Sequence, residues 1–246
     1  MTILRKNWLE PPQSPTRTTF ARLSRTTGSL MRELMNLEIE AMSLEGRILD
    51  VGGGLNASYN HLLRCEGEVL SVNIDSEISP SVVADFADPL PFDSNSFDTV
   101  ISFNTLEHLA DDQFALNEMV RVLKPGGQVK LLVPFLYRVH GHPNDFHRHT
   151  ASGWNVMLQR AGVPSGHQRI RPLVWDPFST GWAVADVAPL GRNWWRARRL
   201  LRSIVLRRPL LMSPIDRREQ GDAADVIGDY ALGFVISAQR PEASDT

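Results

Sequence analysis

The chain has 246 residues, of which 42% are hydrophobic and 22% are charged, a composition typical of an ordinary soluble globular protein. A formal net charge of -2 excludes a general attraction to nucleic acid, and no run of about 18 apolar residues predicts a transmembrane helix. The single cysteine, Cys65, cannot form an internal disulfide, so we expect a cytoplasmic protein.

The N-terminal segment, residues 1–28, is rich in Pro, Ser, Thr and Arg and has Glu10 as its only acid. This composition is typical of a flexible arm, which either covers the active site or remains a disordered tail. We expect residues 29–246 to form a single domain, because α/β domains commonly reach this size.

From Leu30 onward, helix and strand patterns alternate. Apolar residues at three- and four-residue steps predict helices over about 30–42, 111–123 and 151–161, and a further helix is expected to follow a glycine turn and to end near Arg64. Short aliphatic and aromatic runs predict seven strands, at 47–51, 68–74, 81–84, 97–103, 128–133, 168–174 and 230–238. This alternation predicts an α/β fold, a mostly parallel sheet with helices on both faces.

The most informative segment is residues 46–56, where a short apolar strand ends in Asp50 and is followed by Gly52, Gly53 and Gly54. Glycine has no Cβ, so such a turn can adopt positive φ angles and let a ligand lie against the backbone. At the carboxyl edge of an α/β sheet, this is where a nucleotide-like cofactor binds. A tight turn without a ligand is the alternative.

The spacing of the glycines also fits the G-x-G-x-x-A fingerprint of dinucleotide-binding proteins, with Asp75 about twenty residues later. A nicotinamide-dependent oxidoreductase is therefore a competing hypothesis. Three features argue against it: an acid inside the first strand, a second acid, Asp85, after the third predicted strand, and the segment 90–98 that leads into the fourth strand.

Taken together, these segments resemble the class I S-adenosylmethionine-dependent methyltransferases, especially their small-molecule branch. The resemblance extends from about Ile48 to Gly162 and rests on seven segments in the same order: 49–54, 73–75, 84–86, 90–92, 96–98, 106–108 and 121–127. It implies a Rossmann-like, seven-stranded, mostly parallel sheet and S-adenosylmethionine as the cofactor.

Cofactor-binding roles follow for residues at the strand ends. A carboxylate at Asp75 can accept hydrogen bonds from both ribose hydroxyls, each worth about 1.5–3 kcal/mol. The resemblance implies that Asp85 accepts from the adenine amino group and that Asn104 lies beside the reacting methyl. The expected cofactor site comprises Asp50, Gly52, Gly53, Gly54, Asp75, Asp85, Phe86 and Asn104. Both strand-end acids could instead be turn-forming residues.

A histidine-rich loop follows the fifth predicted strand. Four of the seven histidines, at positions 140, 142, 147 and 149, lie within ten residues of one another. Methyl transfer to a hydroxyl usually needs a base, and histidine suits proton transfer near neutral pH. We assign catalytic roles to His108, His140, His142 and Asp145.

Two other interpretations of this loop compete with catalysis. The cluster could hold a divalent metal, but its spacing matches no fixed ligand pattern, so no metal ligand is assigned. The loop could also be packed by its own hydrogen bonds, with Asp145 and Arg148 as a structural ion pair.

The sequence of this loop resembles methyltransferases of surface-glycan and natural-product pathways, which implies a sugar or another hydroxylated small molecule as acceptor. We therefore expect an O-methyltransferase. The signature of base and amide methylases is absent after Asn104, so a nucleic-acid acceptor is not expected.

An insert at about 176–226 contains seven arginines and no acids between Arg192 and Arg208, interleaved with tryptophan and aliphatic residues. A helix with a solvated basic face explains this pattern most simply. A lid or subunit contact, a lipid-linked substrate, or peripheral attachment to a membrane are the alternatives. A non-catalytic subunit that binds a partner through this segment is the third functional hypothesis.

Overall fold

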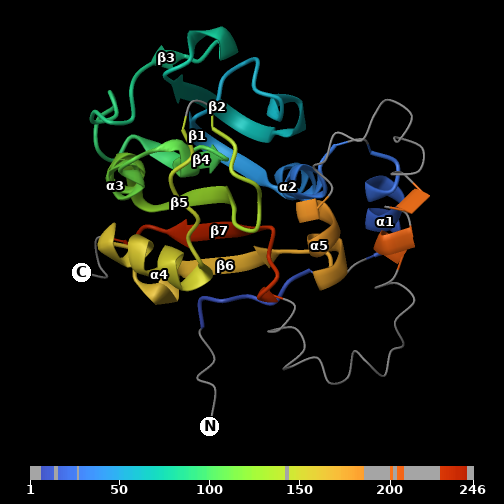
Figure 1. Cartoon of the computed structure of the whole chain (residues 1–246). Helices are drawn as coiled ribbons and strands as arrows, with labels where there is room; N and C mark the ends of the chain where they lie inside the picture. The colour runs from blue at the N-terminus through green and yellow to red at the C-terminus, as the bar shows by residue number, and fades with distance from the viewer. Residues whose placement is uncertain are drawn as a thin grey trace.

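The computed structural model describes residues 7–13, 16–26, 28–141, 144–185, 200–201, 204–207 and 228–242. A seven-stranded sheet lies at the centre of this part of the chain (Figure 1). Its strands are β1 (Ser43–Val51), β2 (Arg64–Asn73), β3 (Val82–Val83), β4 (Phe97–Phe103), β5 (Leu123–Pro134), β6 (Gln168–Leu173) and β7 (Gly233–Gln239).

The strands lie in the order β3-β2-β1-β4-β5-β7-β6. All pairs from β3 to β5 are parallel, whereas β7 runs antiparallel to both of its neighbours. The predicted seven-stranded, mostly parallel α/β fold is therefore confirmed. Because β1, β2, β4 and β5 are parallel, their carboxyl ends meet at one edge, where the loops that follow them come together.

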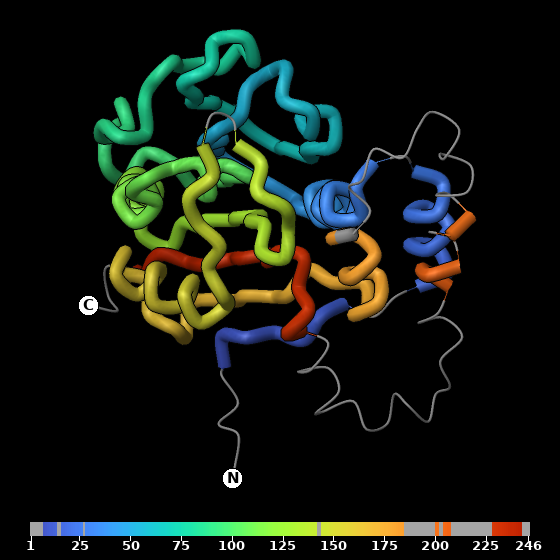
Figure 2. Tube along the Cα trace, viewed as in Figure 1, coloured from blue at the N-terminus to red at the C-terminus, as the bar shows by residue number. Residues whose placement is uncertain are grey.

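Helices cover both faces of the sheet (Figures 1 and 2). On one face, α3 (Asp112–Val122) and α4 (Ala151–Arg160) pack Leu116, Met119 and Leu158 into a core with the inward side chains of β4, β5 and β7. On the other face, α2 (Leu30–Ala41) packs Met35 and Ile39 against β1 and β4, next to α1 (Arg17–Leu23) and α5 (Pro177–Ala185).

Three predicted helices form because their apolar stripes face these cores and because each begins at a capping side chain. Ser29 accepts a hydrogen bond from the amide of Arg32 at the start of α2. Asp111 and Thr150 act in the same way at the starts of α3 and α4. The predicted strand over 97–103 coincides with β4.

The prediction of a helix after the glycine turn is wrong, because only a 3-10 turn, η1 (Asn60–Leu62), lies there. The amides of Leu55 and Asn56 donate to the carbonyls of Ser79 and Ile78, and the Asn56 side chain donates to Glu77 O. These groups are therefore bound to the loop after β2 instead of starting a helix, a competition that asparagine side chains favour.

Part of the N-terminal segment packs against the domain instead of forming a flexible arm. Ile170 in β6 donates to Trp8 O at 2.8 Å and accepts from the amide of Glu10 at 2.9 Å, so residues 8–10 continue the sheet beyond β6. Trp8 is buried, and Arg22 in α1 forms an ion pair with Glu40 in α2. The structure corrects the prediction for this part of residues 1–28.

No helix among the described residues is both long and apolar enough to span a membrane. Most of the insert at 176–226, including nearly all of the segment between Arg192 and Arg208, lies outside those residues. The alternatives for that segment and the single-domain boundary of 29–246 stay predictions.

Candidate active site

The glycine turn after β1 is held by its neighbours at the carboxyl edge of the sheet. The amide of Gly52 donates to Val72 O at 2.8 Å, and the Asn73 side chain donates to Gly52 O at 2.6 Å. Gly52 has a φ of 92°, in the region that favours glycine. A Cβ on Gly52 would clash with the Thr105 side chain, so packing within the protein already requires glycine here.

The carboxylate of Asp50 lies directly under this turn. A Cβ on Gly53 would clash with it, and both of its oxygens accept from the Tyr59 hydroxyl, at 2.9 and 3.0 Å. Burial raises the pKa of Asp50 to about 7, because an ionised carboxylate loses its hydration there. Asp50 therefore supports the turn from below, and a direct contact with the cofactor stays a prediction.

Several polar groups above the turn have no partner within the described part of the chain. The amides of Gly53 and Gly54 make no hydrogen bond to it. The Oδ1 atom of Asn104 is buried and unpaired, and this residue has a φ of 52°, which turns the chain sharply after β4. Such unsatisfied groups are costly unless a ligand or water pairs with them, so they fit a cofactor that offers both acceptors and donors.

Asp75 and Asp85 lie where the sequence predicts them, at the ends of β2 and β3, and both are exposed. In each, Oδ1 accepts from the amide two residues later, of Glu77 and Ala87, at 2.9 Å. Asp75 and Asp85 therefore both form turns, as the alternative interpretation predicted. Each uses only one carboxylate oxygen for this, and its Oδ2 atom makes no hydrogen bond to described residues. Phe86 packs its ring into the core.

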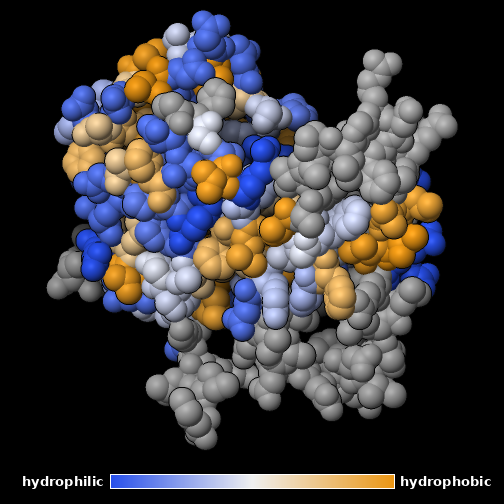
Figure 3. Space-filling view, viewed as in Figure 1, coloured by the Kyte–Doolittle hydropathy of each residue, from blue (hydrophilic) through white to orange (hydrophobic). Residues whose placement is uncertain are grey.

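The histidine-rich loop, described over residues 135–141 and 144–150, leaves β5 and returns to α4 (Figure 2). The amide of Phe146 donates to Glu107 O at 2.7 Å, and the Asn144 carbonyl lies 2.6 Å from His108 Nδ1. These contacts bind the loop to η3 (Leu106–His108), the 3-10 turn after β4. Hydrophilic side chains gather on this face, with hydrophobic patches among and below them (Figure 3).

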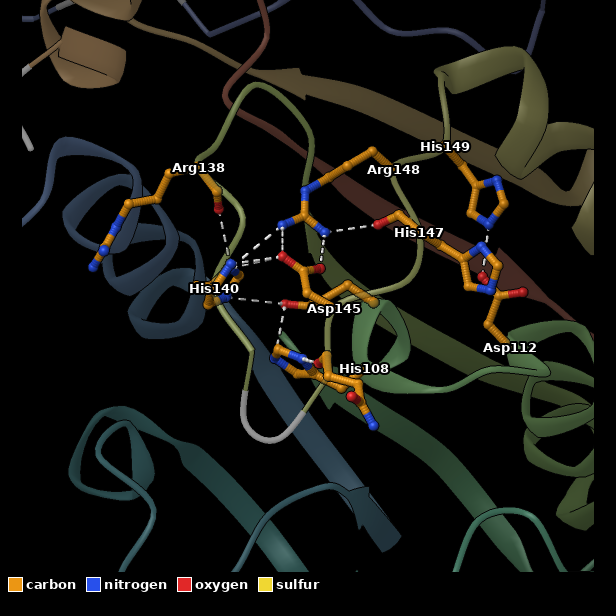
Figure 4. A network of polar contacts seen from close by, with 10 residues as sticks. His108, Asp112, Arg138, His140, Asp145, His147, Arg148 and His149 are labelled. Atoms are coloured by element: carbon orange, nitrogen blue, oxygen red, sulfur yellow. Dashed lines mark hydrogen bonds and ion pairs between the residues drawn. The ribbon is translucent and has the colours of Figure 1, made fainter.

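Asp145 organises the loop (Figure 4). Its two oxygens accept from the guanidinium of Arg148 at 2.5 and 2.6 Å, and Oδ2 also accepts from the amide of His140 at 2.8 Å. Burial opposes ionisation, but these hydrogen bonds outweigh it and hold the pKa of Asp145 at about 2. Asp145 is thus a permanent anion that fixes His140, and the Asp145–Arg148 ion pair considered from the sequence is present.

Glu107 is the residue whose importance the sequence did not reveal. Only 2% of its side chain is exposed, yet neither carboxylate oxygen has a hydrogen-bond partner among the described residues. Its Oε1 lies 3.7 Å from His108 Nε2 and 3.9 Å from His140 Nε2. Burial raises the pKa of Glu107 to about 7, whereas burial lowers the pKa of His140 despite the nearby Asp145.

The fold thus brings together three of the four residues predicted to be catalytic, His108, His140 and Asp145, while His142 lies outside the described residues. A signal for Glu107 was present: an acid next to His108, directly after a buried strand. Its side-chain direction depends on η3, which the sequence pattern did not predict.

A second group lies beside the first, on the side of the loop nearer α3 and α4 (Figure 4). His149 Nε2 lies 2.6 Å from Asp112 Oδ2, and His147 Nε2 lies 3.1 Å from Ala110 O. The rings of His147 and His149 are stacked, and His149 meets Trp154 edge to face. The groups named in these contacts have partners, so this part of the loop has a structural role.

Comparison with known proteins finds a family match over part of the chain. The family described as "Methyltransferase domain" matches residues 49–131. The ubiquinone/menaquinone biosynthesis C-methyltransferase UbiE of Idiomarina loihiensis is 33% identical over 104 residues, covering 35% of this chain and 41% of that protein. The UbiE of Shewanella frigidimarina is 31% identical over 114 residues, covering 39% and 45%.

The chain thus spans less than half the length of these relatives. Among solved structures, a Haemonchus contortus phosphoethanolamine N-methyltransferase 2 in complex with S-adenosyl-L-methionine superposes with a TM-score of 0.49 at 15% identity, covering 85% of this chain and 52% of that one.

These sequence matches favour the methyltransferase prediction over the nicotinamide oxidoreductase that the glycine spacing also allowed. The matched residues include the glycine turn, both strand-end acids and Asn104, which form the edge of the sheet described above. The match over residues 49–131 shows that this part of the chain is similar to the methyltransferase domain family, in agreement with the predicted S-adenosylmethionine-dependent methyltransferase.

Proposed function

We propose that this chain transfers the methyl group of S-adenosylmethionine to a hydroxyl oxygen of a small polar molecule such as a sugar or a natural product. The observation that carries the proposal is the Glu107 carboxylate, which is buried, unpaired and faced by His108 and His140. A hydroxyl must lose its proton as its oxygen attacks the methyl carbon. This cluster can bind the hydroxyl and take up the proton or stabilise the oxygen left behind.

The unpaired groups above the glycine turn support the cofactor half of this proposal. The amides of Gly53 and Gly54 would donate to the amino-acid tail, and Asn104 Oδ1 would accept from it beside the methyl group. The free oxygen of Asp75 would accept from the ribose, and that of Asp85 from the adenine amino group, while the backbone of Phe86 would meet the ring edge.

Bound S-adenosylmethionine would supply a methyl group on a good leaving group, so the protein's task is alignment and exclusion of water. Asn104 and Glu107 are only three residues apart, after the same strand, which supports adjacent positions for the cofactor and the acceptor. The loop that binds to η3 would cover the acceptor.

The relatives do not identify the methyl acceptor of this chain, because the family match ends at residue 131, before the histidine-rich loop. The oxygen acceptor rests on the polar character of the loop and on its resemblance to methyltransferases of glycan and natural-product pathways. The relatives favour a second candidate, methyl transfer to carbon, since both are named C-methyltransferases.

Incubation of the full chain with deuteromethyl-labelled S-adenosylmethionine and a panel of sugars, polyols, phenols and lipid-linked sugars tests the proposal. Mass spectrometry should detect a labelled product, and NMR should place the methyl on oxygen. A carbon-bound methyl would establish the second candidate. Tight cofactor binding without product from any acceptor would favour the non-catalytic subunit.

The variant Glu107→Gln tests the role of the cluster directly. It should lower the methyl-transfer rate by about 10²–10⁴-fold, because it removes the acidic member while keeping the shape. Affinity for S-adenosylhomocysteine, measured by calorimetry, should change little. His167→Gln, in the 3-10 turn η4 (Ser165–His167) outside the loop, is the matched control. An undiminished rate in Glu107→Gln would refute the assignment.

A further inference from the structure

Two groups of side chains among the described residues each offer three possible metal ligands: Glu107, His108 and His140, and, beside them, Asp112, His147 and His149. In each group, one donor atom from every residue lies within 4.8 Å of the other two. The two groups differ in whether the carboxylate already has a hydrogen-bond partner among the described residues, and this difference favours the first group as the cation site.

In the first group, the carboxylate of Glu107 is almost completely buried and has no hydrogen-bond partner in the part of the chain that the structure describes. Its Oε1 faces the Nε2 atoms of His108 and His140 at 3.7 and 3.9 Å, which is too far for hydrogen bonds. A buried carboxylate without a partner is costly, and a cation between the three donors would remove that cost.

We propose that Glu107, His108 and His140 form a binding site for one divalent transition-metal cation of the Zn²⁺ class, with an open position for an oxygen of the methyl acceptor. Two imidazoles and one carboxylate are the ligand set of catalytic zinc sites, which keep a fourth position for water or substrate. This proposal differs from the sequence-based assignment of no metal ligand.

The hydrogen bonds of the two histidines prepare them as ligands (Figure 4). His108 Nδ1 lies 2.6 Å from the Asn144 carbonyl, so this nitrogen carries the proton and Nε2 has a free lone pair. His140 Nδ1 lies 3.2 Å from Arg138 O and 3.3 Å from Asp145 Oδ2, both acceptors. Metal-bound histidines usually donate their second nitrogen to a carbonyl or carboxylate in this way.

One contact opposes this tautomer of His140. Arg148 Nη2 lies 3.3 Å from the same Nδ1 and could donate to it. However, Nη2 already donates to Asp145 Oδ2 at the shorter distance of 2.6 Å. Two acceptors and one engaged donor surround Nδ1, so the proton resides on Nδ1 and the free lone pair of Nε2 points toward Glu107.

The spacing of the donors fits a small cation. Ligand atoms at about 2.0–2.1 Å from Zn²⁺ in a tetrahedral arrangement lie roughly 3.4 Å apart. The observed separations of 3.7 and 3.9 Å exceed this by a few tenths of an ångström. Side-chain rotations without backbone movement can close this difference.

The second group is bonded within the protein. His149 Nε2 is paired with Asp112 Oδ2, and His147 Nε2 with the carbonyl of Ala110. The carboxylate of this group is therefore already paired, whereas that of Glu107 is not. With one acid and two histidines, the second group provides a matched control.

The inference rests on the proposed function in one respect, the position of the acceptor at this cluster. A hydroxyl oxygen in the open position would lose its proton more readily, as water bound to such a cation does. The proton passes to solvent water, the carbon–oxygen bond forms and the carbon–sulfur bond breaks. Glu107 then acts as a ligand, which accounts for its importance without requiring it to accept the proton itself.

Cobalt substitution tests the site. The full chain is stripped with a chelator, desalted and titrated with Co²⁺, and the visible d–d absorption of a low-coordinate cobalt site is recorded. One equivalent should bind and should be displaced by one equivalent of Zn²⁺. Glu107→Gln and His108→Gln should each weaken Co²⁺ binding by at least about 100-fold, since loss of an outer-shell partner alone costs 10–100-fold. His149→Gln should bind Co²⁺ like the wild type.

Several outcomes would overturn the inference. Absence of the absorption band, or unchanged Co²⁺ affinity in both Glu107→Gln and His108→Gln, would exclude the site. Loss of binding in His149→Gln alone would move the cation to the second group. Circular dichroism and S-adenosylhomocysteine binding confirm that each variant is folded. Methyl transfer that persists after chelation, with no Co²⁺ bound, would refute the metal and leave the proposed function standing.

Discussion

Asp50 is a buried carboxylate whose hydrogen bonds within the described part of the chain come from a single donor, the hydroxyl of Tyr59. Burial places its pKa at about 7, above the ordinary value of 3.8. Below pH 3.8 the carboxyl is protonated in both the folded and the unfolded chain. Between pH 3.8 and about 7 only the unfolded chain releases the proton, so the free energy of unfolding falls as the pH rises and levels off above pH 7.

The variant Asp50→Asn should lack this pH dependence. A shift of about three pKa units corresponds to about 4 kcal/mol, so the stability of the variant relative to the wild type should rise by about that amount between pH 4 and pH 8. Urea denaturation at both pH values measures the difference. Parallel stability profiles for the two proteins would show that Asp50 is not buried in the form described.

At the same scale, local pairings could be predicted better than distant ones. The Asp145–Arg148 ion pair could be considered from the sequence because the two residues are three positions apart. The bond from the His140 amide to Asp145 could not, because it forms only when the loop turns back on itself. The direction of Glu107 likewise depends on contacts between segments distant in sequence.

At the scale of elements, the patterns that worked were those with a clear apolar stripe and a cap. The strand β4 and the helix α3 are examples, because both faces of β4 are buried and the Asp111 side chain caps the start of α3. The prediction of a helix after the glycine turn was wrong for a physical reason. Its first amides are bonded to the loop after β2, a partner that no local pattern reveals.

The glycine turn makes an element-scale prediction. Gly52→Ala should lower the free energy of unfolding by about 2–4 kcal/mol, because it combines a positive φ with a clash against Thr105. Gly166→Ala is the control, since a Cβ there meets nothing within 4 Å, and it should change stability by less than about 0.5 kcal/mol. Equal effects in thermal or chemical denaturation would contradict the described turn.

At the scale of the whole molecule, the seven-stranded sheet was predicted from the sequence, but the segment that pairs with its edge strand, β6, was not. Residues 8–10 bond to β6, far from them in sequence, and their polar, proline-rich surroundings gave no sign of this. The apolar Trp8 was the available signal. It packs into the same core as β4, β5 and α4.

The variant Trp8→Ala should therefore destabilise the whole domain, by about 3 kcal/mol, as expected for loss of a buried aromatic side chain. Leu9→Ala, at an adjacent residue that is 36% exposed, should cost much less. Denaturant unfolding of the two variants gives the comparison. A Trp8→Ala protein as stable as the wild type would mean that the N-terminal segment does not pack as described.

The most direct test of the central claim is calorimetric titration of S-adenosylmethionine into the wild type and Asp75 variants. Asp75→Ala should weaken binding roughly 10- to 100-fold, because it removes charge-assisted hydrogen bonds to the ribose. Asp75→Asn keeps the bond to the amide of Glu77, so it separates the loss of charge from the loss of the turn, and Asp88→Ala is the exposed-acid control. Unchanged affinity in both Asp75 variants would contradict a cofactor bound at the carboxyl edge of this sheet.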